Sequence, residues 1–374
     1  MKLILLALAL GVLVVVLIVL ALKRWTSPRT LARVDASLST AENARAMGAR
    51  YASKRPGRAL AIGIVEGGNS DVVTVGSAPG GSTINGGTVF ELGSVTKAFT
   101  GLLLAEMVVR GEVHLDWRLA DVLRAAALSA AAADITLLQL ATHTSGLPRI
   151  PPDLSDGEDK EDPYAHYTRE RLLGSLESIE VAPSSTSDYS NYGVGLLGEA
   201  LAIHSGMGYA ELLRQRVLDP LGLSSASVGE PSDELIQGFM GKKPTPPWTL
   251  PSLAGAGGLR LSMDDLTSFL RAMISPPNGW RPILDLAWMP HFRDDESGSH
   301  VGLCWQIEGK GDDQLIWHNG STFGATSFVG IRPAADVGVA AVQNQSELMG
   351  MLLGNPCAAE AIGRSLLRRN ESRP

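Results

Sequence analysis

Residues 90–100, which read FELGSVTKAFT, join a short apolar segment to a segment with a helical pattern. Ser94 and Lys97 lie three residues apart, a spacing that puts two side chains on one face of a helix. An amine beside a hydroxyl is what a weakly nucleophilic serine needs for activation. If the serine opens the helix, the helix dipole adds positive charge where an oxyanion would form. An ordinary helix start with a solvated lysine can have the same spacing by chance. The interpretation of Ser94 as an activated nucleophile therefore needs support from other segments.

Two further motifs follow in order along the chain. Tyr189-Ser190-Asn191 precedes an apolar helical run, and His318-Asn319-Gly320-Ser321 ends a segment that reads as a strand. Serine-x-x-lysine, tyrosine-x-asparagine and basic-x-glycine, in this order, resemble the class C β-lactamases and D-alanyl-D-alanine peptidases, a superfamily of penicillin-recognising serine hydrolases. The connecting segments 135–148 and 256–266 are also similar to the family. The resemblance covers roughly residues 56–369.

The resemblance implies an α+β fold, with an antiparallel sheet flanked by helices and an inserted all-helical subdomain. The residue pattern agrees, since strand-like segments lie near both ends of the chain and helical patterns fill the middle. We expect a linker and helix over 26–55, a hydrolase domain over 56–374, and the helical subdomain over about 115–250. The expected strands are 59–65, 71–75, 89–92, 301–307, 315–318, 327–331 and 337–343.

Residues 1–25 contain a long apolar run. Leu3 to Leu22 has no charged or polar side chain, and about 20 such residues span a bilayer as a helix. A cleaved signal peptide has a shorter apolar region and a small-residue cleavage site, whereas Lys23 and Arg24 follow this run. We therefore expect a single-pass membrane anchor, with secretion after signal cleavage as the alternative. The family resemblance implies a bacterial inner membrane with the catalytic domain on the extracytoplasmic, periplasmic side.

Composition narrows the classes of partner. Among the 374 residues, 45% are hydrophobic, enough for a large core, and the net charge of −7 argues against a nucleic-acid partner. No cluster of cysteine and histidine has metal-ligand spacing and no phosphate-binding glycine loop is visible, so we expect neither metal nor cofactor. Cys304 and Cys357 could form a disulfide or remain two buried thiols, and the sequence leaves both open.

The resemblance gives each motif residue a role. Ser94 would be the nucleophile that forms an acyl-enzyme, and either Lys97 or Tyr189 would take its proton. Burial lowers a lysine pKa, and a phenolate needs nearby positive charge, so the residues alone do not choose between them. Asn191 would orient Lys97 and a substrate amide through hydrogen bonds.

The third motif carries the main departure from the family. His318 stands where many members have lysine, and histidine is only partly charged at neutral pH, which puts recognition of a substrate carboxylate in doubt. Gly320 implies a close approach of the backbone to the acyl group. The resemblance places the oxyanion hole at the backbone N–H groups of Ser94 and Ser321.

These observations predict a serine hydrolase that acts on amide or ester bonds. The expected substrates are D-amino-acid peptides, including fragments derived from peptidoglycan, β-lactams and small esters. The alternative is a catalytically inactive binding or scaffold protein at the membrane. An intact set of Ser94, Lys97, Tyr189 and Asn191 argues against that alternative, because a decayed site would tolerate the loss of any of them.

Overall fold

The computed structural model describes residues 28, 31–78, 81, 83–157, 159–182, 184–229, 234–352 and 354–368. The expected membrane anchor at residues 3–22 lies outside these ranges. Within them, every helix is too short or too polar to cross a bilayer.

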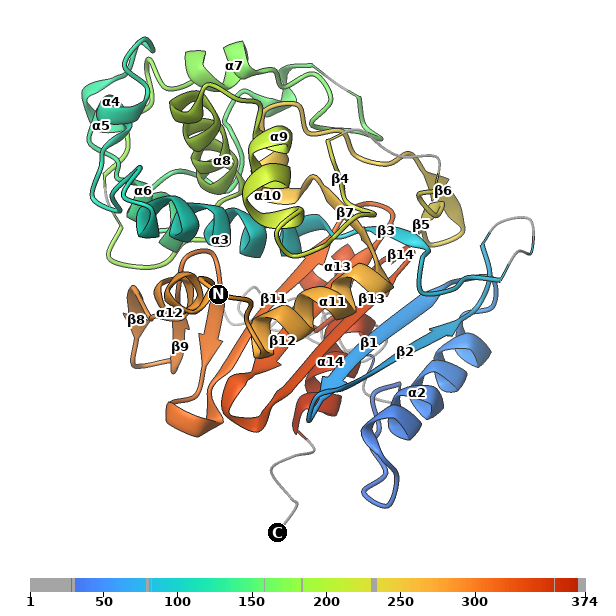
Figure 1. Ribbon diagram of the computed structural model, residues 1–374. Helices are drawn as coiled ribbons and strands as arrows, with labels where there is room; N and C mark the ends of the chain where they lie inside the picture. The colour runs from blue at the N-terminus through green and yellow to red at the C-terminus, as the bar shows by residue number, and fades with distance from the viewer. Residues whose placement is uncertain are drawn as a thin grey trace, which may run out of the picture.

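An antiparallel sheet runs through the centre of the described chain (Figure 1). Its order is β2-β1-β13-β12-β11-β10-β9-β8, so the hairpin from the start of the domain pairs with the last long strand. Ile62 of β1, for example, lies opposite Ala341 of β13. The prediction of an α+β fold whose sheet is built from both ends of the chain is therefore confirmed. The strands are β1 (Leu60–Glu66), β2 (Asn69–Val75), β8 (Phe292–Asp294), β9 (Ser299–Val301), β10 (Gln306–Glu308), β11 (Leu315–Ser321), β12 (Thr326–Arg332) and β13 (Val337–Gln343).

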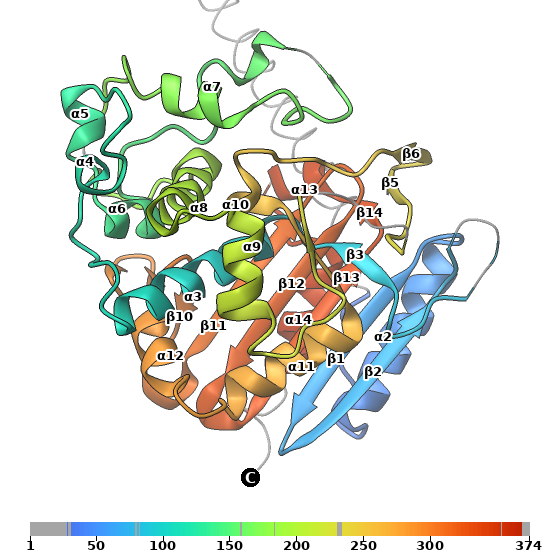
Figure 2. The same ribbon diagram turned by 45° about the horizontal axis from the view of Figure 1, so that its top comes forward.

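Helices cover both faces of this sheet (Figure 2). Helices α2 (Thr40–Lys54) and α14 (Ala358–Leu367) pack on one face, and α11 (Met263–Ile274) packs on the other. Successive side chains of a strand point to opposite faces. Accordingly, Leu60 and Ile62 of β1 join the core under α2 and α14, whereas Ala61 belongs to the larger core on the other side.

A helical region lies beyond one edge of the sheet and packs against α3 (Figure 1). It falls within the segment of about 115–250 that the sequence pattern predicts as a helical subdomain, although that segment also holds three short strands. The α-helices within this segment are α4 (Leu119–Val122), α5 (Ala130–Ala133), α6 (Leu137–Thr142), α7 (Arg169–Gly174), α8 (Asn191–Ser205) and α9 (Tyr209–Leu213). The described residues outside it also form α3 (Thr96–Val109), α10 (Ala254–Gly257), α12 (Arg281–Trp288) and α13 (Leu348–Leu352). Two small sheets have the orders β3-β7-β4 (Val89–Glu91, Leu259–Ser262, Ser227–Val228) and β14-β5-β6 (Gln345–Ser346, Gly238–Met240, Lys243–Thr245).

The prediction of a single strand over 301–307 is wrong. Strands β9 and β10 are separated by a turn in which the Gly302 N–H donates to the Trp305 carbonyl and Cys304 has a left-handed φ of 60°. The Cys304 N–H also donates to the Ala141 carbonyl at 2.9 Å, so the turn is held by the helical region and not by the sheet. Cys304 and Cys357 are both buried free thiols.

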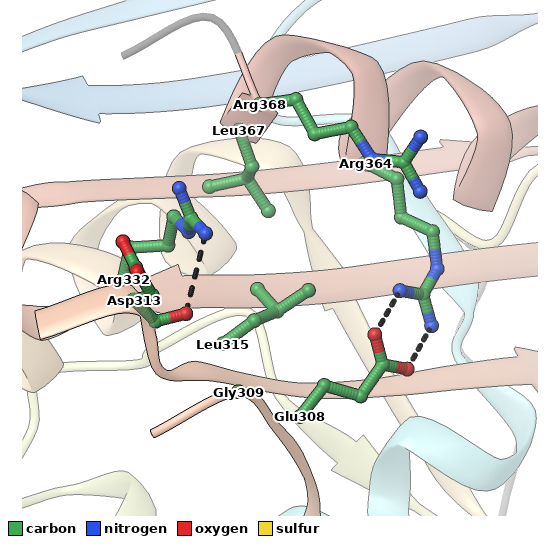
Figure 3. Close-up of a pocket in the computed structure, with 8 residues that line it drawn as sticks. All are labelled: Glu308, Gly309, Asp313, Leu315, Arg332, Arg364, Leu367 and Arg368. Carbon is green, nitrogen blue, oxygen red and sulfur yellow. Dashed lines mark hydrogen bonds and ion pairs between the residues drawn. The ribbon is translucent and has the colours of Figure 1, made fainter. Parts of the chain in front are cut away.

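A hollow of about 580 Å³ lies beside the start of β11, between the sheet and α14 (Figure 3). Arg364 of α14 forms two parallel hydrogen bonds of 3.0 Å with the Glu308 carboxylate, and its guanidinium lies 3.9 Å from the centre of the Trp317 ring. Arg332 donates to the Asp313 carbonyl in the same hollow. The contacts of Arg364 attach α14 to strands β10 and β11, so we interpret the cluster as structural.

Candidate active site

Ser94 lies in a tight turn, Gly93–Val95, directly before helix α3. The positive end of the α3 dipole is therefore next to the serine. Gly93 has a φ of 51°, and a Cβ there would lie 2.7 Å from the Ser321 carbonyl oxygen. Only glycine allows this turn to press against the end of strand β11.

Lys97 lies one turn into α3 and is completely buried. Its Nζ is 3.3 Å from Ser94 Oγ, 2.8 Å from Asn191 Oδ1 and 2.6 Å from the Ala256 carbonyl oxygen. Burial disfavours the ammonium form and lowers the pKa of Lys97 to about 7. The amine therefore exists partly in its neutral form near neutral pH. The Ala256 carbonyl comes from α10, within a glycine-rich segment.

Asn191 is the first residue of α8. Ser190 caps this helix, since its Oγ accepts the Gly193 N–H at 2.8 Å. The Asn191 side chain links two groups, because its Oδ1 accepts from Lys97 and its Nδ2 donates to the Tyr164 hydroxyl at 3.3 Å. Asn191 therefore holds the lysine amine in place, in the orienting position that the motif predicts.

Tyr189 lies between three basic side chains. The centre of its ring is 4.9 Å from Lys97 Nζ, 5.0 Å from the Arg149 guanidinium carbon and 4.7 Å from the centre of the His143 ring. Burial raises the pKa of the Tyr189 hydroxyl, although a hydrogen bond to Ser94 and the charge of Arg149 oppose this rise. Tyr189 is therefore a neutral phenol in the free protein.

The end of β11 meets the turn that carries Ser94. Strand β10 pairs with β11 only as far as Trp317, so among the described strands none pairs with residues 318–321 on that side. A Cβ at Gly320 would lie 2.0 Å from the Leu92 carbonyl oxygen and 2.9 Å from the Ser94 nitrogen. The absence of a side chain at Gly320 thus lets the backbones of Ser94 and Ser321 approach each other.

His318 is buried and neutral. Its Nδ1 lies 2.6 Å from the Asn319 carbonyl oxygen. A carbonyl only accepts, so the ring proton is on Nδ1 and Nε2 carries a lone pair. Within the described residues Nε2 has no hydrogen-bond partner. Burial and the nearby Lys97 lower the pKa of His318 to about 3, so this position supplies no positive charge at neutral pH.

Comparisons with known proteins agree with this arrangement. The model of the Beta-lactamase family matches residues 42–359. The chain belongs to the beta-lactamase family. It is 27% identical to penicillin-binding protein 4 of Amycolatopsis lactamdurans over 77% of this chain and 81% of that protein. It is 29% identical to the D-alanyl-D-alanine-carboxypeptidase/endopeptidase AmpH of Escherichia coli K12 over 50% of this chain and 49% of that protein.

A class C beta lactamase from Rhodobacter sphaeroides has the same fold, with a TM-score of 0.71 over 87% of this chain and 97% of that one, at 22% identity. The resemblance stated from the three motifs is therefore confirmed. The chain is a serine hydrolase of this family.

A cavity of about 620 Å³ opens beside Tyr189 and His318. Its far wall is the segment around the β8–β9 turn, which contributes Asp294, Asp295, Glu296 and Arg293. His143 also lines the cavity, and its Nδ1 accepts the Ser190 N–H at 3.2 Å. This bond orients the Tyr189–Asn191 segment, so His143 acts as a packing residue of the beta-lactamase-family site.

An aromatic wall on the Asn191 side was not predicted. Tyr164, Trp248 and Phe323 pack edge to face in series, with ring centres 5.2 Å and 4.8 Å apart. Buried Glu91 holds this wall, since it accepts the Trp248 N–H and the Thr322 hydroxyl, each at 2.9 Å. These residues come from four separate segments without a shared motif, so the sequence offered no signal for them.

The site has no grouping that suggests a metal. In the described part of the chain, no three histidine, cysteine, aspartate or glutamate residues lie close enough to hold an ion.

Proposed function

We propose that this protein forms an acyl-enzyme at Ser94 and hydrolyses D-amino-acid peptides, β-lactams or small esters. The observation that carries the proposal is the Lys97 amine, partly neutral near pH 7 and 3.3 Å from Ser94 Oγ at the start of a helix. A neutral amine within hydrogen-bond distance is a competent general base for a serine hydroxyl.

In the first step, Lys97 takes the hydroxyl proton while Ser94 Oγ attacks the substrate carbonyl carbon. The carbonyl oxygen becomes an oxyanion between the N–H groups of Ser94 and Ser321, which the glycines at 93 and 320 bring together. Each such donor contributes roughly 3 kcal/mol to the transition state. The Asn191 amide keeps the lysine aligned through its 2.8 Å hydrogen bond.

In the second step, the bond to the leaving group breaks and that group takes a proton. Tyr189 is placed to pass on the proton held by Lys97, since the centre of its ring lies 4.9 Å from Lys97 Nζ and its neutral hydroxyl interacts with Ser94. Water then attacks the acyl-enzyme with the same groups acting in reverse. We assign the base role to Lys97 and not to Tyr189, because burial lowers the pKa of the amine toward neutrality and raises that of the phenol.

The named relatives support D-amino-acid peptides as the first substrates to test. One is a penicillin-binding protein and another a D-alanyl-D-alanine-carboxypeptidase/endopeptidase. We also propose that residues 3–22 anchor the enzyme in a bacterial inner membrane with the catalytic domain in the periplasm, where such peptides derived from peptidoglycan would be met. Accessibility of the domain to protease in spheroplasts but not in intact cells tests this location.

Mass spectrometry of the purified full-length protein, before and after incubation with a penicillin, tests the acyl-enzyme. We expect an adduct of the drug's mass on the wild type and on the Ser205→Ala variant. Ser205 lies at the end of α8, and its hydroxyl donates to the Leu201 carbonyl of the same helix. Ser94→Ala should give no adduct. An adduct on Ser94→Ala would refute the assignment of the nucleophile.

A small activated ester covers substrates that exclude penicillins. Turnover by the wild type and its loss in Ser94→Ala would support the hydrolase without β-lactam recognition. If neither the penicillin nor the ester reacts, the inactive scaffold becomes the better explanation.

A further inference from the structure

The active site needs a cation if it is to bind a substrate carboxylate, and neither Lys97 nor His318 is available for this purpose. Lys97 is buried and its amine is held by Ser94, Asn191 and Ala256. His318, at the position where many family members have lysine, donates its single ring proton to the Asn319 carbonyl and carries no charge. Neither residue therefore offers a charged donor to a ligand.

Arg149 supplies a cation from a different segment. It follows the turn after α6, and its carbonyl oxygen accepts the Asn191 N–H at 2.8 Å, which fixes its backbone at the start of α8. Its guanidinium lies 5.0 Å from the centre of the Tyr189 ring, and the residue is exposed. Its charge also reaches Lys97, Tyr164 and Tyr189, whose pKa values it lowers.

The guanidinium of Arg149 has no acidic partner among the described residues. Arg171, in the same region, pairs with Asp153, whereas no carboxylate or carbonyl of the described residues accepts from Arg149. Stacking on an aromatic ring leaves the edge of a guanidinium free, and this edge can hold a carboxylate through two parallel hydrogen bonds.

The cavity beside Tyr189, which Arg149 does not line, contains mainly negative charge. Three carboxylates, Asp294, Asp295 and Glu296, line the cavity there, against one arginine, Arg293. Nearby negative charge disfavours a bound anion. The charges around Tyr189 therefore favour an anionic group on the Arg149 side and disfavour one on the β8–β9 side.

We propose that Arg149 binds the carboxylate of the substrate and determines the preference of this enzyme for acidic substrates. The inference rests on the proposed function, because it concerns the substrate of the same site. It moves carboxylate recognition from the end of β11, where the family resemblance would place it, to the segment before α8.

The test compares esters that differ only in one charge. The first pair is mono-4-nitrophenyl glutarate and its methyl ester, with the carboxylate on the acyl chain. The second pair is 4-acetoxybenzoate and its methyl ester, with the carboxylate on the leaving group. The ratio of kcat/KM for the acidic ester over its neutral partner is measured for the full-length wild type, Arg149→Gln, Arg149→Lys and Arg293→Gln. This ratio cancels any general effect of Arg149 on Lys97 or on folding.

We expect Arg149→Gln to lower the ratio about tenfold or more in at least one pair, Arg149→Lys to retain part of it, and Arg293→Gln to leave it near the wild-type value. An equal loss on acidic and neutral esters, or an effect that follows Arg293, would overturn the proposal. Failure of the wild type to turn over either neutral ester would instead count against the proposed function, so the two failures are distinguishable.

Discussion

The start of helix α3 and the end of strand β11 each contribute one basic side chain to the active site, Lys97 and His318. Burial lowers the pKa of both side chains, but with different results. It lowers the pKa of Lys97 from an ordinary lysine value to about 7, where the amine can exchange a proton. It lowers the pKa of His318 to about 3, where the ring stays neutral. Desolvation in the same direction thus leaves Lys97, a strong base in water, able to exchange a proton near pH 7, and leaves His318, a weaker base, uncharged.

The largest effect should come from removing the amine on the α3 side. Lys97→Met keeps an apolar chain of similar length in this buried position, and we expect kcat/KM for an activated ester to fall about 1000-fold, within the range for a general base. Circular dichroism and a thermal melt show whether the variant is folded. A folded variant within tenfold of the wild type would mean that Lys97 is not the base.

The contact between the two regions can be broken at Gly320. A methyl group there would meet the Leu92 carbonyl at 2.0 Å, so Gly320→Ala must push β11 away from Ser94. We expect activity to fall about 100-fold and the free energy of unfolding to fall by about 1–3 kcal/mol, as for an overpacked core.

Gly174→Ala is the matched control for Gly320→Ala. Gly174 lies in α7, where a Cβ would meet nothing within 4 Å. Alanine favours a helix by about 1 kcal/mol over glycine, so stability should hold or rise and activity should not change. Wild-type activity in Gly320→Ala would contradict the close approach of the two backbones.

The protonation of Lys97 sets the expected pH profile. The base works when it is neutral. Activity is therefore lost as the pH falls through the Lys97 pKa of about 7, and it reaches its full value above that pH. We expect kcat/KM to drop about tenfold per pH unit below this value and to level off above it. A profile that rises only near pH 10, as for an unperturbed lysine, would show that burial does not activate the amine.

The smallest effect should come from replacing the histidine of β11. Because His318 is already neutral, His318→Gln removes no charge, and we expect kcat/KM to fall less than about tenfold with the same pH midpoint. The comparison with Lys97→Met uses the same ester and the same stability check. A loss as large as that of Lys97→Met, or a shifted midpoint, would show that His318 takes part in proton transfer.

The sequence identified the parts of the site that depend on local spacing. Ser94 and Lys97 share a helix face whatever surrounds them, and Tyr189 and Asn191 are tied together by the start of α8. The order of three motifs then indicated the family, which the family model confirmed. The apolar runs at 59–65, 327–331 and 337–343 likewise predicted the long strands β1, β12 and β13, which are buried along nearly their whole length.

The sequence failed where distant segments decide the conformation. Residues 301–307 have the composition of one strand, but the Cys304 N–H is held by the Ala141 carbonyl of the helical region, and the backbone turns there. Nor could it place Tyr164, Trp248 and Phe323 in one wall, because their contacts join segments far apart in the chain.

What the sequence determined by itself is the family, the antiparallel sheet built from both ends of the chain, and the residue types that gather at the nucleophile. Only the tertiary structure decided which groups carry charge there. A side chain's identity gives its pKa in water, but the value in the protein depends on what excludes water from it and what accepts its protons. For Lys97 these are Asn191 and Ala256, 94 and 159 residues away along the chain.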